Sequence, residues 1–281
     1  MFFRWLKRRR RARVISAPFP KEWLGFIERN VGYYALLNDV ERKKLQDDLR
    51  IFMAETSFEG CAGLTLTDEI KATIAAQASL LLLGFQDDYF ERVQTVLVYP
   101  TGFRSPEGWR RPDGVIHSDG VGMLGEAWHQ GTVILAWDSV LAGGRNAHDG
   151  RNVVLHEFAH QIDFLDGFAD GMPPLANREQ YRRWHVVMRQ EYERLFAASH
   201  HGRPTVLDSY AATDDAEFFA VATEAFFESS VEMRRRHPQL YEVLMEYYRQ
   251  DTAERISAKT GGDRIGVSWN RPDAEKSRRT D

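Results

Sequence analysis

The stretch Asn152-Val-Val-Leu-His-Glu-Phe-Ala-His-Gln-Ile-Asp163 contains the pattern His-Glu-x-x-His, which begins at His156 and ends at His160. Residues four apart on a helix share a face, so both imidazoles can bind one zinc ion. Glu157 follows His156 and can reach a water molecule bound to that ion. The other face is apolar, since it carries Val154, Leu155, Phe158, Ile162 and Leu165. We therefore expect residues 152–165 to form a helix with one buried side and one reactive side.

A catalytic zinc ion usually has three protein ligands and one open position. The longer pattern that supplies a third histidine is broken here, because Asp163 stands where a glycine is needed and Asp166 where the histidine is needed. The third ligand is then expected to be a carboxylate from a later helix. Glu179 is one option, and Glu217 and Glu224 are better ones. The last two are seven residues apart, so both can share a helix face, and spacing alone does not choose between them.

Outward from this segment, apolar periodicity predicts helices, then strands, then helices. Residues 101–131 are typical of loops, and residues 141–150 are typical of a turn-rich connector. The expected helices are 20–57, 69–83, 152–165, 178–199, 214–229 and 238–259, and the expected strands are 94–99 and 132–137. This order favours an α+β fold over alternating βαβ units.

Composition is that of an ordinary globular protein, with 281 residues, 43% hydrophobic and 28% charged. The single cysteine, Cys61, excludes an intrachain disulfide and a cysteine-rich zinc module. The longest apolar runs, such as residues 133–137, are five residues long and too short to span a membrane. Because no signal-like segment is evident, we expect a cytoplasmic protein.

Basic charge is concentrated at the start of the chain. Residues 1–14 carry seven basic residues and no acidic one, so the rest of the chain is net acidic. An acidic body argues against direct nucleic-acid binding. We expect residues 1–14 to be a solvated, frayed tail, with a weak membrane-surface or nucleic-acid contact as the alternative.

Several longer stretches make the sequence resemble the Mlc titration factor A family of bacterial zinc metallopeptidases, which are gluzincin-type enzymes. The zinc domain of anthrax lethal factor is distantly similar. The combination Tyr-Ala-Ala…Ala-Glu-Phe-Phe-Ala-Val is more distinctive than His-Glu-x-x-His alone. The matching stretches are Val96–Pro100, Gly125–Gly131, Leu155–Asp163, Asp208–Val221 and Tyr247–Asp251. The basic start and the polar end are not part of this resemblance.

The resemblance implies a role for each candidate residue. His156, His160 and Glu217 would bind one zinc ion per chain, with Glu157 as the general base. Tyr210, seven residues before Glu217, would steady the oxyanion. Asp163 and Glu224 would be outer carboxylates that orient a ligating imidazole.

The resemblance also implies a mainly helical, zincin-like fold with a small mixed β-sheet. We expect the chain to divide into a basic tail (1–14), a helical part (15–90), a catalytic part (91–260) packed with it as one globular unit, and a polar tail (261–281).

The implied function is aminopeptidase-type hydrolysis of peptides, linked to glucose uptake through binding of the Mlc repressor. By analogy with other zincins, residues 132–137 would hold an extended peptide as an edge strand. The alternative is a binding protein that sequesters a regulator and whose zinc is structural. An open coordination position argues against that alternative.

Overall fold

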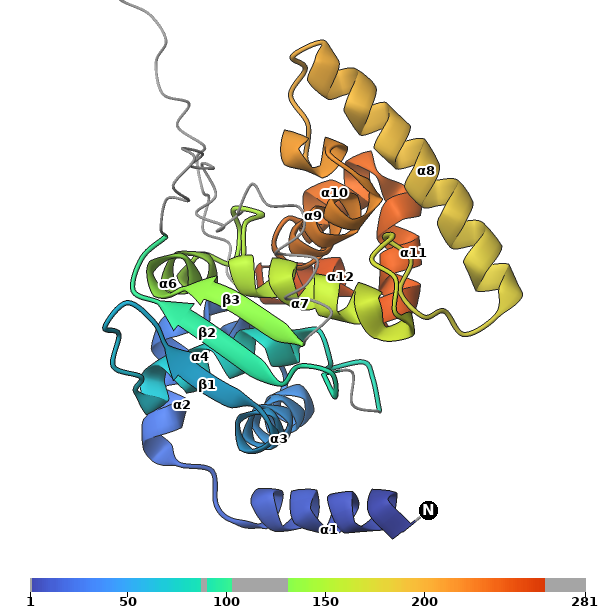
Figure 1. Cartoon of the computed structure of the whole chain (residues 1–281). Helices are drawn as coiled ribbons and strands as arrows, with labels where there is room; N and C mark the ends of the chain where they lie inside the picture. The colour runs from blue at the N-terminus through green and yellow to red at the C-terminus, as the bar shows by residue number, and fades with distance from the viewer. Residues whose placement is uncertain (1, 87–89, 103–130, 261–281) are drawn as a thin grey trace, which may run out of the picture.

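The computed structural model describes residues 2–86, 90–102 and 131–260. Its described part is mainly helical, with a small sheet at one side (Figure 1). The elements are α1 (Phe2–Ser16), α2 (Lys21–Asn30), η1 (Gly32–Leu36), α3 (Asp39–Glu55), β1 (Ser57–Gly60), α4 (Asp68–Leu80), β2 (Thr95–Tyr99), β3 (Thr132–Ala136), α6 (Trp137–Arg145), α7 (Val153–Asp163), η2 (Phe164–Asp166), α8 (Arg178–His200), η3 (Ser209–Ala212), α9 (Asp215–Glu228), α10 (Ser230–Arg236), α11 (Pro238–Tyr248) and α12 (Thr252–Thr260). This architecture confirms the expected α+β class.

The sheet has the order β1-β2-β3 and is parallel throughout the described residues, where we expected a mixed sheet. Thr95 pairs with Ser57 on one side and with Thr132 on the other. The chain between β1 and β2 includes α4, which is the crossover that a parallel pair requires. The predicted strands at 94–99 and 132–137 are confirmed as β2 and β3. β1 was not predicted, because it is only four residues long and largely exposed.

The helix α7 lies between the sheet and the helices that follow it, in contact with β3, α4, α6 and α9 (Figure 1). Asn152 begins it, since its side-chain oxygen accepts hydrogen bonds from the backbone amides of Val154 and Leu155. All eleven residues of α7 are buried. On its apolar face, Phe158 packs edge-on against Phe52 and Phe90. The rigid core thus holds the helix that carries the histidine pattern.

Two glycines account for a helix that we did not predict. We took residues 141–150 to be a connector, yet Gly143 and Gly144 lie within α6. A Cβ at Gly143 would come within 2.9 Å of the Cα of Asn152, and one at Gly144 within 2.4 Å of the Asn30 carbonyl oxygen. These glycines therefore serve the close approach of α6 to its neighbours and do not mark a turn.

The basic start differs from the frayed tail that we expected, because residues 2–16 form α1, which packs on α3. Lys7 and Arg11 are one turn apart and face acidic partners: Lys7 Nζ lies 2.7 Å from Glu91 Oε1, and Arg11 donates to both oxygens of Glu55. Arginine and lysine are also good helix formers. No helix in the described residues combines the length and apolar character needed to cross a membrane.

Candidate metal centre

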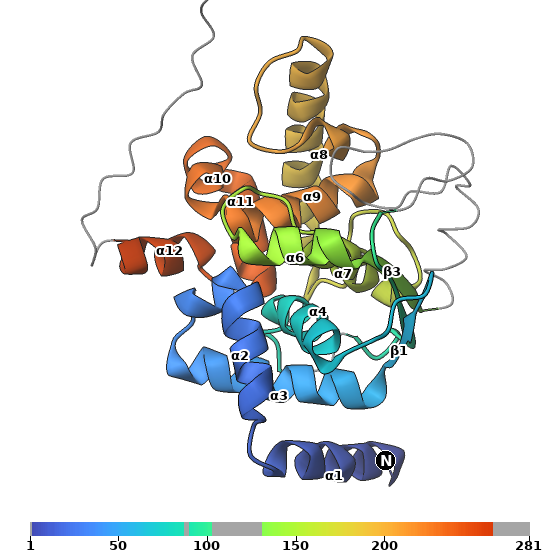
Figure 2. The same cartoon turned by 90° about the vertical axis from the view of Figure 1, so that its left-hand side faces the viewer.

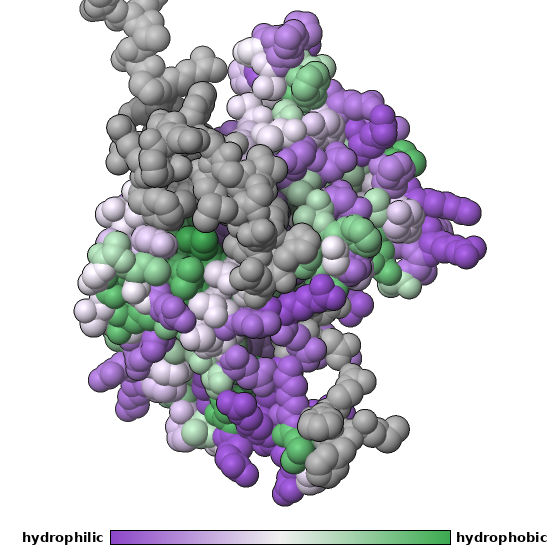
Figure 3. Space-filling view, in the orientation of Figure 1, coloured by the Kyte–Doolittle hydropathy of each residue, from purple (hydrophilic) through white to green (hydrophobic). Residues whose placement is uncertain are grey.

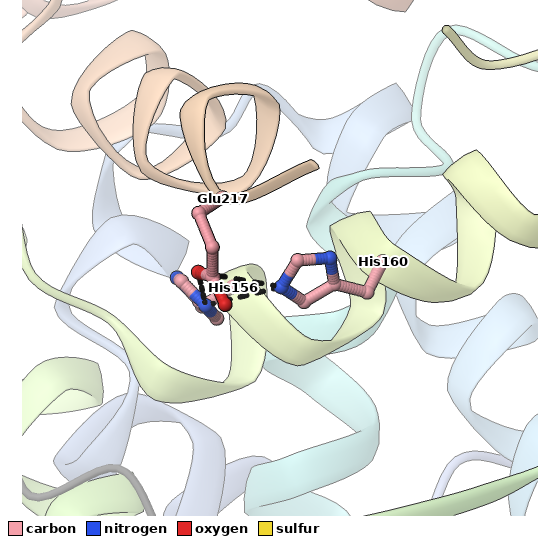
Figure 4. A group of neighbouring side chains, drawn as sticks. All are labelled: His156, His160 and Glu217. Atoms are coloured by element: carbon pink, nitrogen blue, oxygen red, sulfur yellow. Dashed lines mark hydrogen bonds and ion pairs between the residues drawn. The ribbon is translucent and has the colours of Figure 1, made fainter. Parts of the chain in front are cut away.

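Two histidines of α7 and one glutamate of α9 converge on a point between the helices (Figure 4). The Nε2 atom of His156 lies 3.2 Å from Nε2 of His160 and 3.1 Å from Oε2 of Glu217, and His160 Nε2 lies 3.7 Å from that same oxygen. Ligands at tetrahedral angles around an ion with bonds of 2.0–2.1 Å would be about 3.4 Å apart. The three atoms therefore fit a tetrahedral metal ion such as zinc.

The ligand atoms are withdrawn from solvent, since His156, His160 and Glu217 are 2%, 1% and 6% exposed. Burial opposes protonation of His156, but hydrogen bonds with Glu217 and Glu224 outweigh it and raise the pKa of His156 well above its usual value. Burial raises the pKa of Glu217, but the hydrogen bonds from His156 and His160 prevail and hold it far below its usual value. Both shifts show that the pocket favours a positive charge beside Glu217.

Glu224 orients the first histidine. Its Oε1 lies 2.8 Å from Nδ1 of His156, and its Oε2 accepts the backbone amide of Asn152 at 2.5 Å. A carboxylate only accepts hydrogen bonds, so Nδ1 of the imidazole carries a proton and Nε2 faces the point where the three side chains converge. Between the two options that spacing left open, the structure thus brings Glu217 to the ligand position and Glu224 to the outer contact. Glu179, the third option, is exposed at the start of α8.

This arrangement is anchored by Glu228 and Asn152, which the sequence analysis did not identify as site residues. Glu228, one turn after Glu224, accepts the side-chain amide of Asn152 at 3.0 Å and the backbone amide of Arg151 at 3.0 Å. Burial raises the pKa of Glu228 well above its usual value, although the hydrogen bond from Asn152 opposes the shift. The i, i+4 spacing of Glu224 and Glu228 and the helix-start position of Asn152 were the signals in the sequence.

Asp163 takes a different place from the one expected. It lies at the end of α7, fully buried, and its Oδ2 accepts the backbone amide of Gly171 at 2.8 Å. Within the described residues its Oδ1 has no hydrogen-bond partner. Burial raises the pKa of Asp163 to about 7, with the Gly171 amide opposing the shift. Its observed contact therefore ties the segment after α7 back to the helix.

Glu157 and Tyr210 flank the convergent atoms. Glu157 is 7% exposed, and burial raises the pKa of its carboxyl, although His156 and His160 oppose the shift. Tyr210 lies in η3, where its backbone amide donates to Asp208. Its ring stacks on that of His156, with centroids 6.3 Å apart and 28° between the planes. Both side chains thus lie near the convergent atoms.

A cavity of about 350 Å³ opens beside His156 and Tyr210. Its walls come from α6, η3, α9 and the segment before α7, and they combine apolar surface with polar side chains that include Asp138, Asp149, Arg151, Asp208 and Glu224. A cavity with apolar and polar walls beside one of the convergent histidines has the character of a small-ligand site. Residues 125–130 of the Gly125–Gly131 stretch in the sequence resemblance lie outside the described residues.

Comparison with known proteins gives a consistent result. The family model described as glucose-regulated metallo-peptidase M90 matches residues 3–249. The Synechocystis sp. protein slr2042 is 38% identical over 245 residues, which are 87% of this chain and 89% of that protein. The Mlc titration factor A of Yersinia pestis is 30% identical over 234 residues, 81% of this chain and 84% of that protein. The family match includes most of α1, so the basic start is not the departure from the family that the sequence had indicated.

Proposed function

This chain belongs to the glucose-regulated metallo-peptidase M90 family, and we propose that it is a zinc-dependent peptidase of aminopeptidase type that works in the cytoplasm. The observation that carries the proposal is the convergence of His156 Nε2, His160 Nε2 and Glu217 Oε2 at tetrahedral separations. Two imidazoles and one carboxylate, with a fourth position open, form a ligand set typical of catalytic zinc.

Zinc, when bound there, supplies Lewis acidity, which makes water nucleophilic near neutral pH and polarises the scissile carbonyl. The protein's own groups do the rest. Glu157, next to His156 in the sequence, accepts a proton from the attacking water and passes it to the leaving amine. The Tyr210 hydroxyl donates a hydrogen bond to the oxyanion that develops on the carbonyl. Glu224 holds His156 in the orientation that presents Nε2.

Replacing Glu157 by Gln tests this assignment. The variant keeps the size of the side chain and leaves the three ligand atoms in place, so metal content should equal that of the wild type. Hydrolysis of an amino-terminal amino-acid amide should fall by at least about 100-fold, because a positioned general base contributes about that much. His156→Ala should lose both metal and activity. An E157Q enzyme with undiminished turnover would remove Glu157 from the mechanism.

The aminopeptidase assignment has its own test, because an exopeptidase requires a free amino end. Peptide amides with and without an amino-terminal acetyl group should be compared on the same preparation. We expect acetylation to abolish cleavage. Equal cleavage of both would leave a metallopeptidase but contradict the aminopeptidase type.

A second candidate function comes from the similarity to Mlc titration factor A, whose name points to the Mlc regulator. In this alternative the chain binds and sequesters an Mlc-type repressor, and the metal is structural. The two functions are compatible, since binding uses a surface and hydrolysis uses the centre. Binding of purified Mlc to wild type and E157Q separates them. Equal Mlc binding by both proteins, with no peptidase activity in either, would favour the binding protein.

A further inference from the structure

The helix α1 has an outward face that no part of the metal centre uses. Lys7 and Arg11 point toward α3 and the segment before β2, where they meet Glu55 and Glu91. Residues four apart share a helix face, so Trp5, Arg9 and Arg13 share the opposite side. All three are exposed, and the Arg9 guanidinium lies over the Trp5 ring at 4.7 Å. Leu6 and Arg8 are also exposed and flank this side.

Apolar and basic side chains are mixed on this face. Trp5 is 50% exposed and Leu6 is 43% exposed, and residues 1–14 around them contain no acidic residue. Within the described residues, no ion pair holds Arg8, Arg9 or Arg13. The face therefore offers positive charge and apolar contact together.

The position of α1 makes this face accessible to a flat surface. In Figures 1 and 2, which are related by a quarter turn, α1 lies across the lower end of the molecule, and no other described element extends below it. Figure 3 shows the same end as mostly hydrophilic, with small apolar patches. A plane laid against this end would touch the helix along its length before it touched the acidic body.

We propose that α1 is a peripheral membrane-binding helix that lies on an anionic bilayer. The arginines pair with lipid phosphates, and Trp5 occupies the headgroup level, where its amphipathic ring is favoured. Charges beyond about 8 Å are screened at physiological salt, so most of the acidic body does not repel the lipid surface. A nucleic-acid duplex fits less well, because its phosphate backbone offers no apolar layer for the exposed Trp5 and Leu6 side chains.

Vesicle sedimentation tests the proposal with the full-length protein. Vesicles of phosphatidylcholine alone are compared with vesicles that also contain phosphatidylglycerol, at low and at physiological salt. We expect binding to the anionic vesicles only, with weakening as salt is raised. Since each basic residue at an anionic surface strengthens binding about fivefold, the variant R8Q/R9Q/R13Q should bind about 100-fold more weakly. Trp5→Ala should weaken binding further without changing its salt dependence.

A matched variant removes the same charge elsewhere. Arg182, Arg189 and Arg203 are exposed on α8 and the segment after it, and R182Q/R189Q/R203Q should bind the vesicles as the wild type does. Metal content and thermal melting of both triple variants report on folding, and both should be unchanged. The proposal fails if anionic vesicles do not bind the wild type. It also fails if the two triple variants lose vesicle binding equally, or if a duplex oligonucleotide displaces the protein from the vesicles.

Discussion

Charged side chains gather in two contrasting regions of the molecule, the interface of α7 with α9 and the helix α1. Between α7 and α9 they are buried, and Glu217, Glu224 and Glu228 meet imidazoles or amides from the α7 side. On α1 most of the arginines are exposed. A buried charge is costly unless it is paired, whereas an exposed one is stabilised by water. The contrast teaches that the α7–α9 charges depend on partners that the fold supplies, whereas most of the α1 arginines face water.

The largest effect should come from removing a ligand in the buried region. Glu217→Ala deletes one of the three convergent ligands, so metal analysis after dialysis should find the site empty. Glu224→Ala removes only the contact to Nδ1 of His156, and metal affinity should fall by roughly 10–100-fold. Competition with a chelator measures both. Retention of metal by E217A together with its loss from E224A would reverse the two assignments.

Tyr210→Phe should leave the metal in place and slow turnover. Loss of one oxyanion donor lowers kcat by about 10²–10³, and KM should change less because the hydrogen bond strengthens only as charge develops. The alternative is a packing role, since Tyr210 stacks on His156 and precedes α9. Unchanged kcat with a lower melting temperature would support packing and remove Tyr210 from the catalytic residues.

Asn152→Ala compares a buried helix start with an exposed one. Asn152 caps α7 and also donates to Glu228, so its loss leaves a buried carboxylate short of a donor and should cost about 2–4 kcal/mol of unfolding free energy. Asn38 caps α3 through a capping box with Glu41 at the surface, and N38A should cost about 1 kcal/mol. Urea unfolding in chelator measures both. Only N152A should also weaken metal binding, since it loosens the end of α7 that carries His156; equal effects of the two variants on metal binding would contradict this.

Much of the centre could be predicted from sequence because its signals are local. His156 and His160 share a helix, and the strands β2 and β3 have strong short-range patterns. Glu217 was separated from Glu224 only by family resemblance, since the choice depends on how α9 packs against α7. β1 and α6 were missed for the same kind of reason: pairing with β2 makes a strand of four largely exposed residues, and close helix contacts require the glycines of α6. Such tertiary contacts leave no periodic signal.

Asp163 provides a pH-dependent test within the buried region. Its folded-state pKa of about 7 lies above the unfolded value, so the folded chain retains a proton that the unfolded chain has released. Stability of the metal-free wild type should therefore fall as pH rises from roughly 4 to 7, by at most about 1.4 kcal/mol per pH unit. Asp163→Asn keeps an acceptor for the Gly171 amide and removes this loss. The unfolding free energy of the D163N variant, relative to that of the wild type, should increase from pH 5 to pH 8. A constant difference would show that Asp163 is not buried as a neutral acid.

The smallest effect should come from the ion pair that holds α1. Arg11 and Glu55 are each 20% exposed, so water and salt weaken their attraction, and a double-mutant cycle with R11Q and E55Q should give a coupling of about 0.5–1 kcal/mol. Burial raises the pKa of Glu55, but Arg11 outweighs it and the net shift is downward. The coupling should therefore be present above the usual glutamate pKa of about 4.3 and be lost as pH falls below it. Metal content should not change in any of these variants, because Arg11 and Glu55 lie on α1 and α3. Neither caps α7 nor bonds to a carboxylate of α9, as Asn152 does. If R11Q instead released the metal, the basic helix and the metal centre would be coupled, and the separation of the two regions would be wrong.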